Sequence, residues 1–106
     1  MENIKEEVWR ERIAKDKDAV ILDVRTPMEW QDGVLKNAIL INFHDQDNFL
    51  AAMESMDKSK NFYIYCKSGQ RSAYACKILD NLGANHTYNL IGGIIVWKGE
   101  THPYQG

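Results

Sequence analysis

The sequence predicts a three-layer α/β domain, with a doubly wound, mainly parallel sheet and helices on both faces. Short continuous apolar runs, typical of strands that are buried on both sides, alternate along the chain with segments of helical periodicity. The chain has 106 residues, of which 44% are apolar, so we expect residues 1–106 to form one domain around one core. Ligands of such sheets bind beyond the carboxyl ends of the strands, so we look for a site in the loops that follow the strands.

Four segments have the character of buried or half-buried strands. The clearest is the apolar run at residues 19–22, which ends at Asp23. Further strands are expected at residues 38–41, 62–65 and 87–91, which are also short and apolar. The third of the four strands ends directly before a cysteine.

Helical segments separate these strands. Residues 4–15 are rich in charge and carry an apolar side, which predicts a surface helix. Thr26-Pro27-Met28-Glu29 has the pattern of a capping box with proline at the first helical position, so a short helix should follow and end before Gly33. Apolar stripes at residues 49–56 and 75–82 predict two longer helices, and residues 94–98 a short last one.

Charge and composition exclude several classes of function. The net charge is −2, which argues against nucleic-acid binding through bulk charge and against a polybasic membrane anchor. No apolar run reaches the roughly 18–20 residues that span a membrane, and the amino-terminal residues lack the pattern of a secretory signal. Two cysteines without histidines at zinc spacing predict no metal site. We therefore expect a cytoplasmic protein with no nucleic-acid or membrane partner.

The loop after the third strand carries the chemistry. It reads Cys66-Lys67-Ser68-Gly69-Gln70-Arg71-Ser72 and leads into a helix. A cysteine before a helix amino terminus, with Lys67 and Arg71 nearby, is expected to have a lowered pKa. Gly69 allows a tight turn that brings backbone amides toward the sulfur and any anion attached to it. The alternative is a cysteine that only packs in the core, but glycine, lysine and arginine within five residues favour anion chemistry.

Four stretches resemble a single-domain rhodanese, a thiosulfate sulfurtransferase. Leu22-Asp23-Val24-Arg25 with Glu29-Trp30 is similar to an aspartate–valine–arginine motif with a downstream acidic–aromatic pair, and residues 33–38 to a glycine-rich segment. Residues 66–72 match the active loop, and Gly92-Gly93 with Trp97 the closing glycine pair and tryptophan. The resemblance covers roughly residues 19–98, and the active loop is its specific part. Val34 and Asn37 depart from the family pattern outside that loop.

The resemblance implies a sulfur-relay enzyme without metal or organic cofactor. Cys66 would take a sulfane sulfur from thiosulfate or another persulfide donor, become a persulfide, and pass the sulfur to a thiol or cyanide. The loop residues Lys67, Ser68, Gly69, Gln70, Arg71 and Ser72 would bind the persulfide, with the side chains of Lys67 and Arg71 attracting the anionic donor or orienting the loop. Asp23 and Arg25 would support the loop from behind, or simply form an ion pair with each other.

Other functions remain open at this point. A rhodanese-like domain can be a non-catalytic regulatory or protein-binding module, or a sulfur carrier for a partner protein. Phosphatases and arsenate reductases with a similar loop have five residues between cysteine and arginine, whereas four separate Cys66 from Arg71, so these activities are not expected. Cys76 lies on an apolar helical stripe and is interpreted as a core residue. Trp97 and His44 are weaker candidates for the rim of the pocket.

Overall fold

Five parallel strands form one sheet in the order β1-β5-β4-β2-β3. The computed structural model describes residues 1–104. The strands are β1 (Glu2–Ile4), β2 (Ala19–Asp23), β3 (Ile39–Leu40), β4 (Asn61–Tyr65) and β5 (His86–Leu90). The helices are α1 (Glu6–Lys15), α2 (Pro27–Trp30), α3 (Gln46–Ser55) and α4 (Gln70–Asn81), followed by a 3₁₀ turn, η1 (Ile94–Val96). None of the helices in this part of the chain has the length and apolar character needed to cross a membrane.

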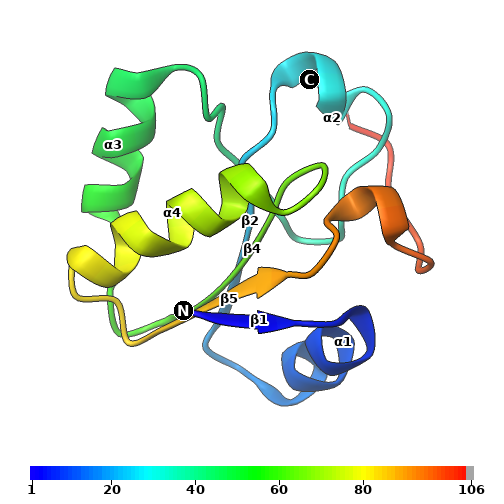
Figure 1. The fold of residues 1–106 in the computed structure, drawn as a ribbon, viewed down its shortest axis with the longest axis horizontal. Helices are drawn as coiled ribbons and strands as arrows, with labels where there is room; N and C mark the ends of the chain where they lie inside the picture. Colours follow the sequence, from blue (N-terminus) through cyan, green and yellow to red (C-terminus); the bar gives the residue numbers. More distant parts are fainter. Residues whose placement is uncertain (105–106) are drawn as a thin grey trace.

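The sheet is covered on both faces, which confirms the predicted three-layer fold (Figure 1). Helices α3 and α4 pack on one face, through Phe49, Met53 and Leu79. Helix α1 packs on the other face through Trp9, whose ring makes an edge contact with Tyr63. Each face therefore has its own apolar cluster, and the strands lie between the two clusters.

Alternation along β4 decides where the following cysteine points. Phe62 and Ile64 belong to the apolar cluster under α3 and α4, whereas Tyr63 and Tyr65 belong to the cluster under α1. Successive side chains of a strand point to opposite faces, so Cys66, the next residue, falls on the α3/α4 face. The strand thus delivers the cysteine to the side of the sheet where helix α4 begins.

The capping box before α2 is present as predicted. The Thr26 hydroxyl accepts a hydrogen bond from the Glu29 amide, and the Glu29 carboxylate accepts one from the Thr26 amide. Pro27 occupies the first turn, where its missing N–H costs nothing. The helix has only four residues, and it ends before Gly33 as expected.

Three predicted boundaries were wrong. Residues Glu2–Ile4 form an edge strand that pairs with β5, so the first helix begins at Glu6 rather than at residue 4. Strand β3 has only two residues, and Ile39 is half exposed because the strand lies at the edge of the sheet. The last helix is a three-residue 3₁₀ turn that ends before Trp97. Short edge elements have no internal periodicity, so tertiary pairing rather than local pattern defines them.

Candidate active site

The loop between β4 and α4 folds around the sulfur of Cys66. Its Sγ atom accepts hydrogen bonds from the backbone amides of Gly69, at 3.1 Å, and of Ser72, at 3.4 Å. The Ser72 hydroxyl lies 3.3 Å from the same sulfur. Cys66 is only 1% exposed, so the sulfur sits at the base of the loop rather than on its surface. The expected ring of donors around one sulfur atom is therefore present.

These contacts explain the acidity of the Cys66 thiol. Burial by itself would raise the pKa of this thiol, because it penalises the thiolate. The hydrogen bonds from the Ser72 hydroxyl and from the amides of Ser72, Gly69 and Ser68 stabilise the thiolate and outweigh that penalty, so the pKa lies below its ordinary value. The amino terminus of α4 acts in the same direction. The loop thus favours a thiolate in a place that water hardly reaches.

Two glycines make this loop geometry accessible. Gly69 has φ +104°, a left-handed conformation that side chains rarely adopt, and its amide faces the sulfur. A side chain at Gly93 would overlap the carbonyl group of Lys67, because the turn after β5 packs directly on the active loop. The amide of Ile94 also donates to the Cys66 carbonyl at 2.9 Å. The turn at Gly92-Gly93, which follows the neighbouring strand β5, therefore packs against the active loop and stabilises it.

Asn89 is a site residue that sequence reasoning missed. Its side-chain amide donates to the Gly69 carbonyl, at 3.1 Å, and to the side-chain oxygen of Asn3, at 3.0 Å. A carbonyl can only accept, so the remaining oxygen of Asn89 faces the Ser72 hydroxyl, which donates to it at 2.5 Å. The single proton of Ser72 is therefore shared between two acceptors, Asn89 and the Cys66 sulfur. A polar residue at a buried position of a predicted strand was the available signal.

Arg71 forms an ion pair with a carboxylate that is distant in the sequence. It forms a bidentate ion pair with Glu29 at 2.7 and 2.8 Å. The Arg71 guanidinium, with help from Thr26, lowers the pKa of Glu29 to about 2, so this carboxylate is ionised at every pH of interest. This ion pair ties the active loop to α2, which favours the loop-orienting role among the two predicted for Arg71. Arg25 donates to the backbone carbonyl of Glu29, at 3.2 Å, and not to its carboxylate.

Asp23 and Arg25 form a buried ion pair at the end of β2. Their closest contact is 2.8 Å, and the Arg25 guanidinium also donates to the Gly33 carbonyl at 2.7 Å. The indole nitrogen of Trp30 donates to Asp23 at 3.2 Å. This cluster fixes α2 and the following turn against the sheet, and α2 in turn carries Glu29. Neither side chain hydrogen-bonds to Cys66, and the link from this cluster to the active loop runs through α2, which carries Glu29, the partner of Arg71.

A pocket of about 280 Å³ opens beside the active loop. The side chains of Lys67, Ser68 and Gln70 are exposed, and none of them hydrogen-bonds to the sulfur; of the three, Lys67 lines the pocket. Residues of α2, of the turn that follows it and of η1 complete the wall: Arg25, Glu29, Asp32, Gly33, Ile94, Ile95 and Thr101. Lys67 is the residue of the active loop that lines this pocket.

The remaining candidates lie elsewhere. Cys76 is fully buried in the α3/α4 cluster, which confirms it as a core residue. Trp97 packs against the α1 cluster and donates to the Glu100 carbonyl, and it does not line the pocket beside the loop. His44 is exposed and lies against Phe43, outside the same pocket. Among residues 1–104, no three histidine, cysteine, aspartate or glutamate side chains converge in a way that would hold a metal ion.

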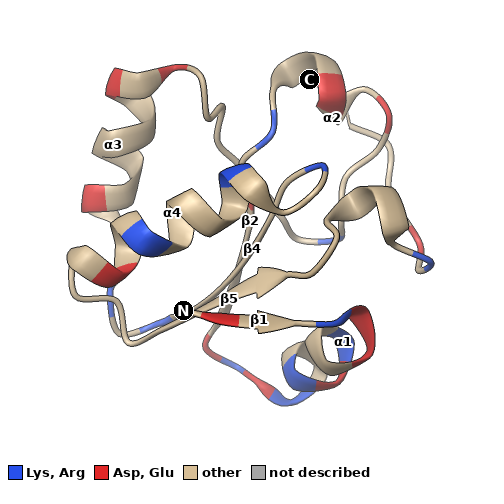
Figure 2. Cartoon of the chain, in the orientation of Figure 1, with Lys and Arg blue, Asp and Glu red and all other residues tan. Residues whose placement is uncertain are grey.

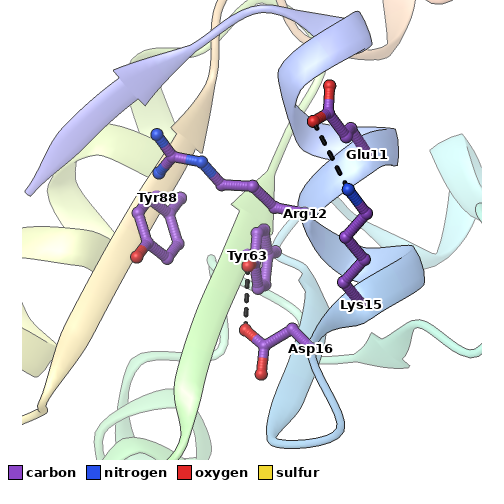
Figure 3. Close-up of a pocket in the computed structure, with 6 residues that line it drawn as sticks. All are labelled: Glu11, Arg12, Lys15, Asp16, Tyr63 and Tyr88. Carbon is purple, nitrogen blue, oxygen red and sulfur yellow. Dashed lines mark hydrogen bonds and ion pairs between the residues drawn. The ribbon is translucent and has the colours of Figure 1, made fainter.

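A second pocket, of about 360 Å³, lies between α1 and strands β4 and β5 (Figure 3). The Arg12 guanidinium lies over the Tyr88 ring, 5.1 Å from its centre. The Tyr63 hydroxyl donates to Asp16 at 2.9 Å, and the charges of Lys15 and Glu11 form a pair. Arg12 also forms an ion pair with Glu2, so each charged side chain of this pocket has a partner. None of the six is a nucleophile of the kind found in the active loop.

Known proteins share this fold and sequence. The profile of the rhodanese-like domain family matches residues 6–100. YtwF of Bacillus subtilis is 37% identical over 94 residues, covering 89% of this chain and 87% of its own length. A sulfurtransferase of Allochromatium vinosum is 35% identical over 94 residues, covering 89% and 85%.

Solved structures agree with the sequence comparison. The crystal structure of a rhodanese-like domain protein from Staphylococcus aureus superposes with a TM-score of 0.84 at 29% identity, covering 99% of this chain and 100% of that one. The family profile covers nearly the whole chain, including the active loop at residues 66–72 and the cluster around Asp23. The chain therefore belongs to the rhodanese-like domain family.

Proposed function

We propose that this protein is a sulfurtransferase that carries a sulfane sulfur as a persulfide on Cys66. The Cys66 thiolate attacks the outer sulfur of a donor such as thiosulfate, the S–S bond of the donor breaks, and sulfite leaves with the bonding electrons. An acceptor thiolate or cyanide then attacks the outer sulfur of the persulfide and regenerates the Cys66 thiolate. Charge and atoms balance in both steps, so neither step requires an oxidant or a cofactor. We place this chemistry in the cytoplasm, where thiols stay reduced.

One observation carries the proposal: the donors that surround the Cys66 sulfur. The amides of Gly69 and Ser72 and the Ser72 hydroxyl all lie within 3.4 Å of it, and together they lower the pKa of a buried thiol. A cysteine that only packs in the core has no use for three polar hydrogens. The name of the Allochromatium vinosum relative, a sulfurtransferase, agrees with this chemistry. A purely regulatory or binding module would not need the donors to converge on the sulfur.

The mass of the intact protein after exposure to a donor tests the proposal. Wild-type protein incubated with thiosulfate and desalted should gain the mass of one sulfur atom, and cyanide should remove it as thiocyanate. The Cys66→Ser variant should gain nothing, and the Cys76→Ala variant should gain one sulfur as the wild type does. Circular dichroism of each variant verifies that the fold is retained.

The result that contradicts the proposal is equally specific. If thiosulfate, an organic thiosulfonate and a low-molecular persulfide all fail to load folded wild-type protein, Cys66 is not a sulfur carrier, and a binding module becomes the better interpretation. If the Cys66→Ser variant still gains sulfur, the carrier is another residue.

A further inference from the structure

Both arginines of the site, Arg71 in the active loop and Arg25 after β2, are already neutralised by a carboxylate partner. Arg71 forms its bidentate pair with Glu29, and Arg25 forms one with Asp23. A guanidinium that is paired in this way offers little net charge to an incoming anion, because the field of its carboxylate cancels most of its own. Attraction of a donor by these arginines is therefore weak.

The pocket beside the loop is also balanced in charge. Lys67 is its one cation without an ion-pair partner within residues 1–104, and the pocket also contains Asp32, which likewise has none there. Its lining has two cations, Arg25 and Lys67, and two anions, Glu29 and Asp32, so the charges of the lining sum to zero. Both acidic and basic positions occur along the chain around α2 and the active loop (Figure 2). This arrangement does not suit a doubly charged anion.

Apolar side chains form the outer lip of the same pocket. This lip consists of Ile94 and Ile95, and Ile95 is 64% exposed although it is a large aliphatic residue. The amide of Ile95 donates to the Lys67 carbonyl at 3.1 Å, which keeps this lip beside the active loop. An apolar lip would contact the organic part of a donor, whereas free thiosulfate has no such part.

The charge of the donor matters because the nucleophile is itself an anion. Thiosulfate brings two negative charges toward the Cys66 thiolate. An organic persulfide, R–S–S⁻, or an organic thiosulfonate, R–SO₂–S⁻, brings only one at the reacting group. In each case the thiolate bonds to the outer sulfur, the donor S–S bond breaks, and R–S⁻ or R–SO₂⁻ leaves with the electron pair. The chemistry is the same as with thiosulfate, but less positive charge is needed to bring the reactants together.

Building on the proposed function, we propose that Glu29 determines donor specificity. By neutralising Arg71, Glu29 makes the site prefer organic donors over free thiosulfate. These organic donors have a singly charged sulfane group and an apolar body. The shared chemistry is the R–S–S⁻ group, on either a small molecule or a protein side chain. The lip of Ile94 and Ile95 receives the apolar body of the donor.

The Glu29→Gln variant tests the charge of this site with little other change. Glutamine serves at this position of a capping box, and its amide oxygen still accepts a hydrogen bond from Arg71. We compare kcat/KM for thiosulfate with kcat/KM for methanethiosulfonate, which has one negative charge and a small body. The variant should raise the thiosulfate-to-methanethiosulfonate ratio by about tenfold, equivalent to about 1.4 kcal/mol. Dividing the kcat/KM ratio of the variant by that of the wild type removes the difference in intrinsic reactivity between the two donors.

Two further variants keep the test decisive. Asp32→Asn removes a negative charge of the pocket, and the Asp32 side chain makes no hydrogen bond within residues 1–104. The variant should therefore shift the same ratio in the same direction, even if Glu29→Gln fails to fold. Glu54→Gln removes one charge from the end of α3, close in the chain to the amino-terminal end of β4, whereas the active loop follows the carboxyl end of that strand. This variant should leave the ratio unchanged.

The apolar lip has its own test. Ile95→Ser should lower kcat/KM for benzenethiosulfonate several-fold and leave methanethiosulfonate unaffected, because the two donors differ in their apolar body and not in charge. A low-molecular persulfide and a persulfidated protein are then compared as donors, which distinguishes the two sources of the R–S–S⁻ group.

The outcomes separate this inference from the proposed function. If Cys66 is loaded with sulfur but Glu29→Gln and Asp32→Asn leave the donor ratio unchanged or lower it, the assignment of donor class is wrong and the persulfide mechanism stands. If no donor loads Cys66, the proposed function fails, and the donor preference fails with it.

Discussion

The two cysteines lie ten residues apart in the chain and in the same apolar cluster, yet the structure gives their thiols opposite properties. Cys66 is 1% exposed and Cys76 is fully buried. Burial raises the pKa of Cys76 to about 12, and a hydrogen bond with Thr87 only partly opposes it. At Cys66 the same penalty is overcome by the donors of the loop. Exposure therefore does not distinguish a reactive cysteine from a packing cysteine here; the polar hydrogens around the sulfur do.

The largest expected difference between the two thiols is in alkylation by iodoacetamide. The thiolate is the nucleophile, and the pKa of Cys66 lies below its ordinary value near 9, whereas that of Cys76 is about 12. At pH 8 the thiolate fractions then differ by at least about 1,000-fold, and we expect a comparable ratio of modification rates. Peptide mass spectrometry of protein that is alkylated for increasing times measures both rates in one sample.

Denatured protein provides the control for this measurement. Without the fold, both cysteines should react at similar rates, because the donors and the burial are lost together. Similar rates in the native protein would show that the loop does not activate Cys66, and the contrast between the two sites would disappear.

A smaller effect is expected from Ser72→Ala. The variant removes the hydroxyl that stabilises the Cys66 thiolate, so the pKa of Cys66 should rise and the apparent pKa of its alkylation should move in the same direction. Hydrogen bonds to charged groups contribute about 1.5–3 kcal/mol, and one shared with Asn89 contributes less, so we expect the alkylation rate at pH 7 to fall about tenfold. The pH profile of the rate distinguishes this effect from a general loosening of the loop.

Ser55→Ala is the matched variant for this comparison. Within residues 1–104 its hydroxyl bonds only to the Ala52 carbonyl, at the end of α3 and outside the active loop. It should leave the alkylation profile of Cys66 unchanged. An unchanged profile for Ser72→Ala as well would mean that the backbone amides of Gly69 and Ser72 alone set the acidity of the thiol.

The predictable part of the site is the part that is local in sequence. Cys66, Gly69 and Ser72 lie within seven residues, so the order of strand, glycine and helix was enough to predict donors around the sulfur. The supporting residues come from farther away. Glu29 is 42 residues from Arg71, and Asn89 is 17 residues from Ser72. No spacing rule connects such positions; the sheet brings them together by placing β2, β4 and β5 side by side.

The fold shows the same division. The buried strands and long helices have internal periodicity, and their positions were predicted to within a few residues. The strand at Glu2–Ile4 was not predicted, because its sequence contains no apolar run. It is defined instead by its pairing with β5. It nevertheless matters for the site, since Asn3 on this strand orients the amide of Asn89. An element without a local pattern can therefore contribute to the active loop through a chain of hydrogen bonds.

Cys76→Ala should have the smallest effect on chemistry and the clearest effect on stability. Removing a fully buried sulfur leaves a small cavity under α4, which we expect to cost about 1–2 kcal/mol of unfolding free energy. Sulfur loading on Cys66 should stay within about twofold of the wild type, because no hydrogen bond connects the two residues. Urea unfolding and the mass gain with thiosulfate measure the two quantities. Unchanged stability with a large loss of loading would assign Cys76 to the sulfur relay.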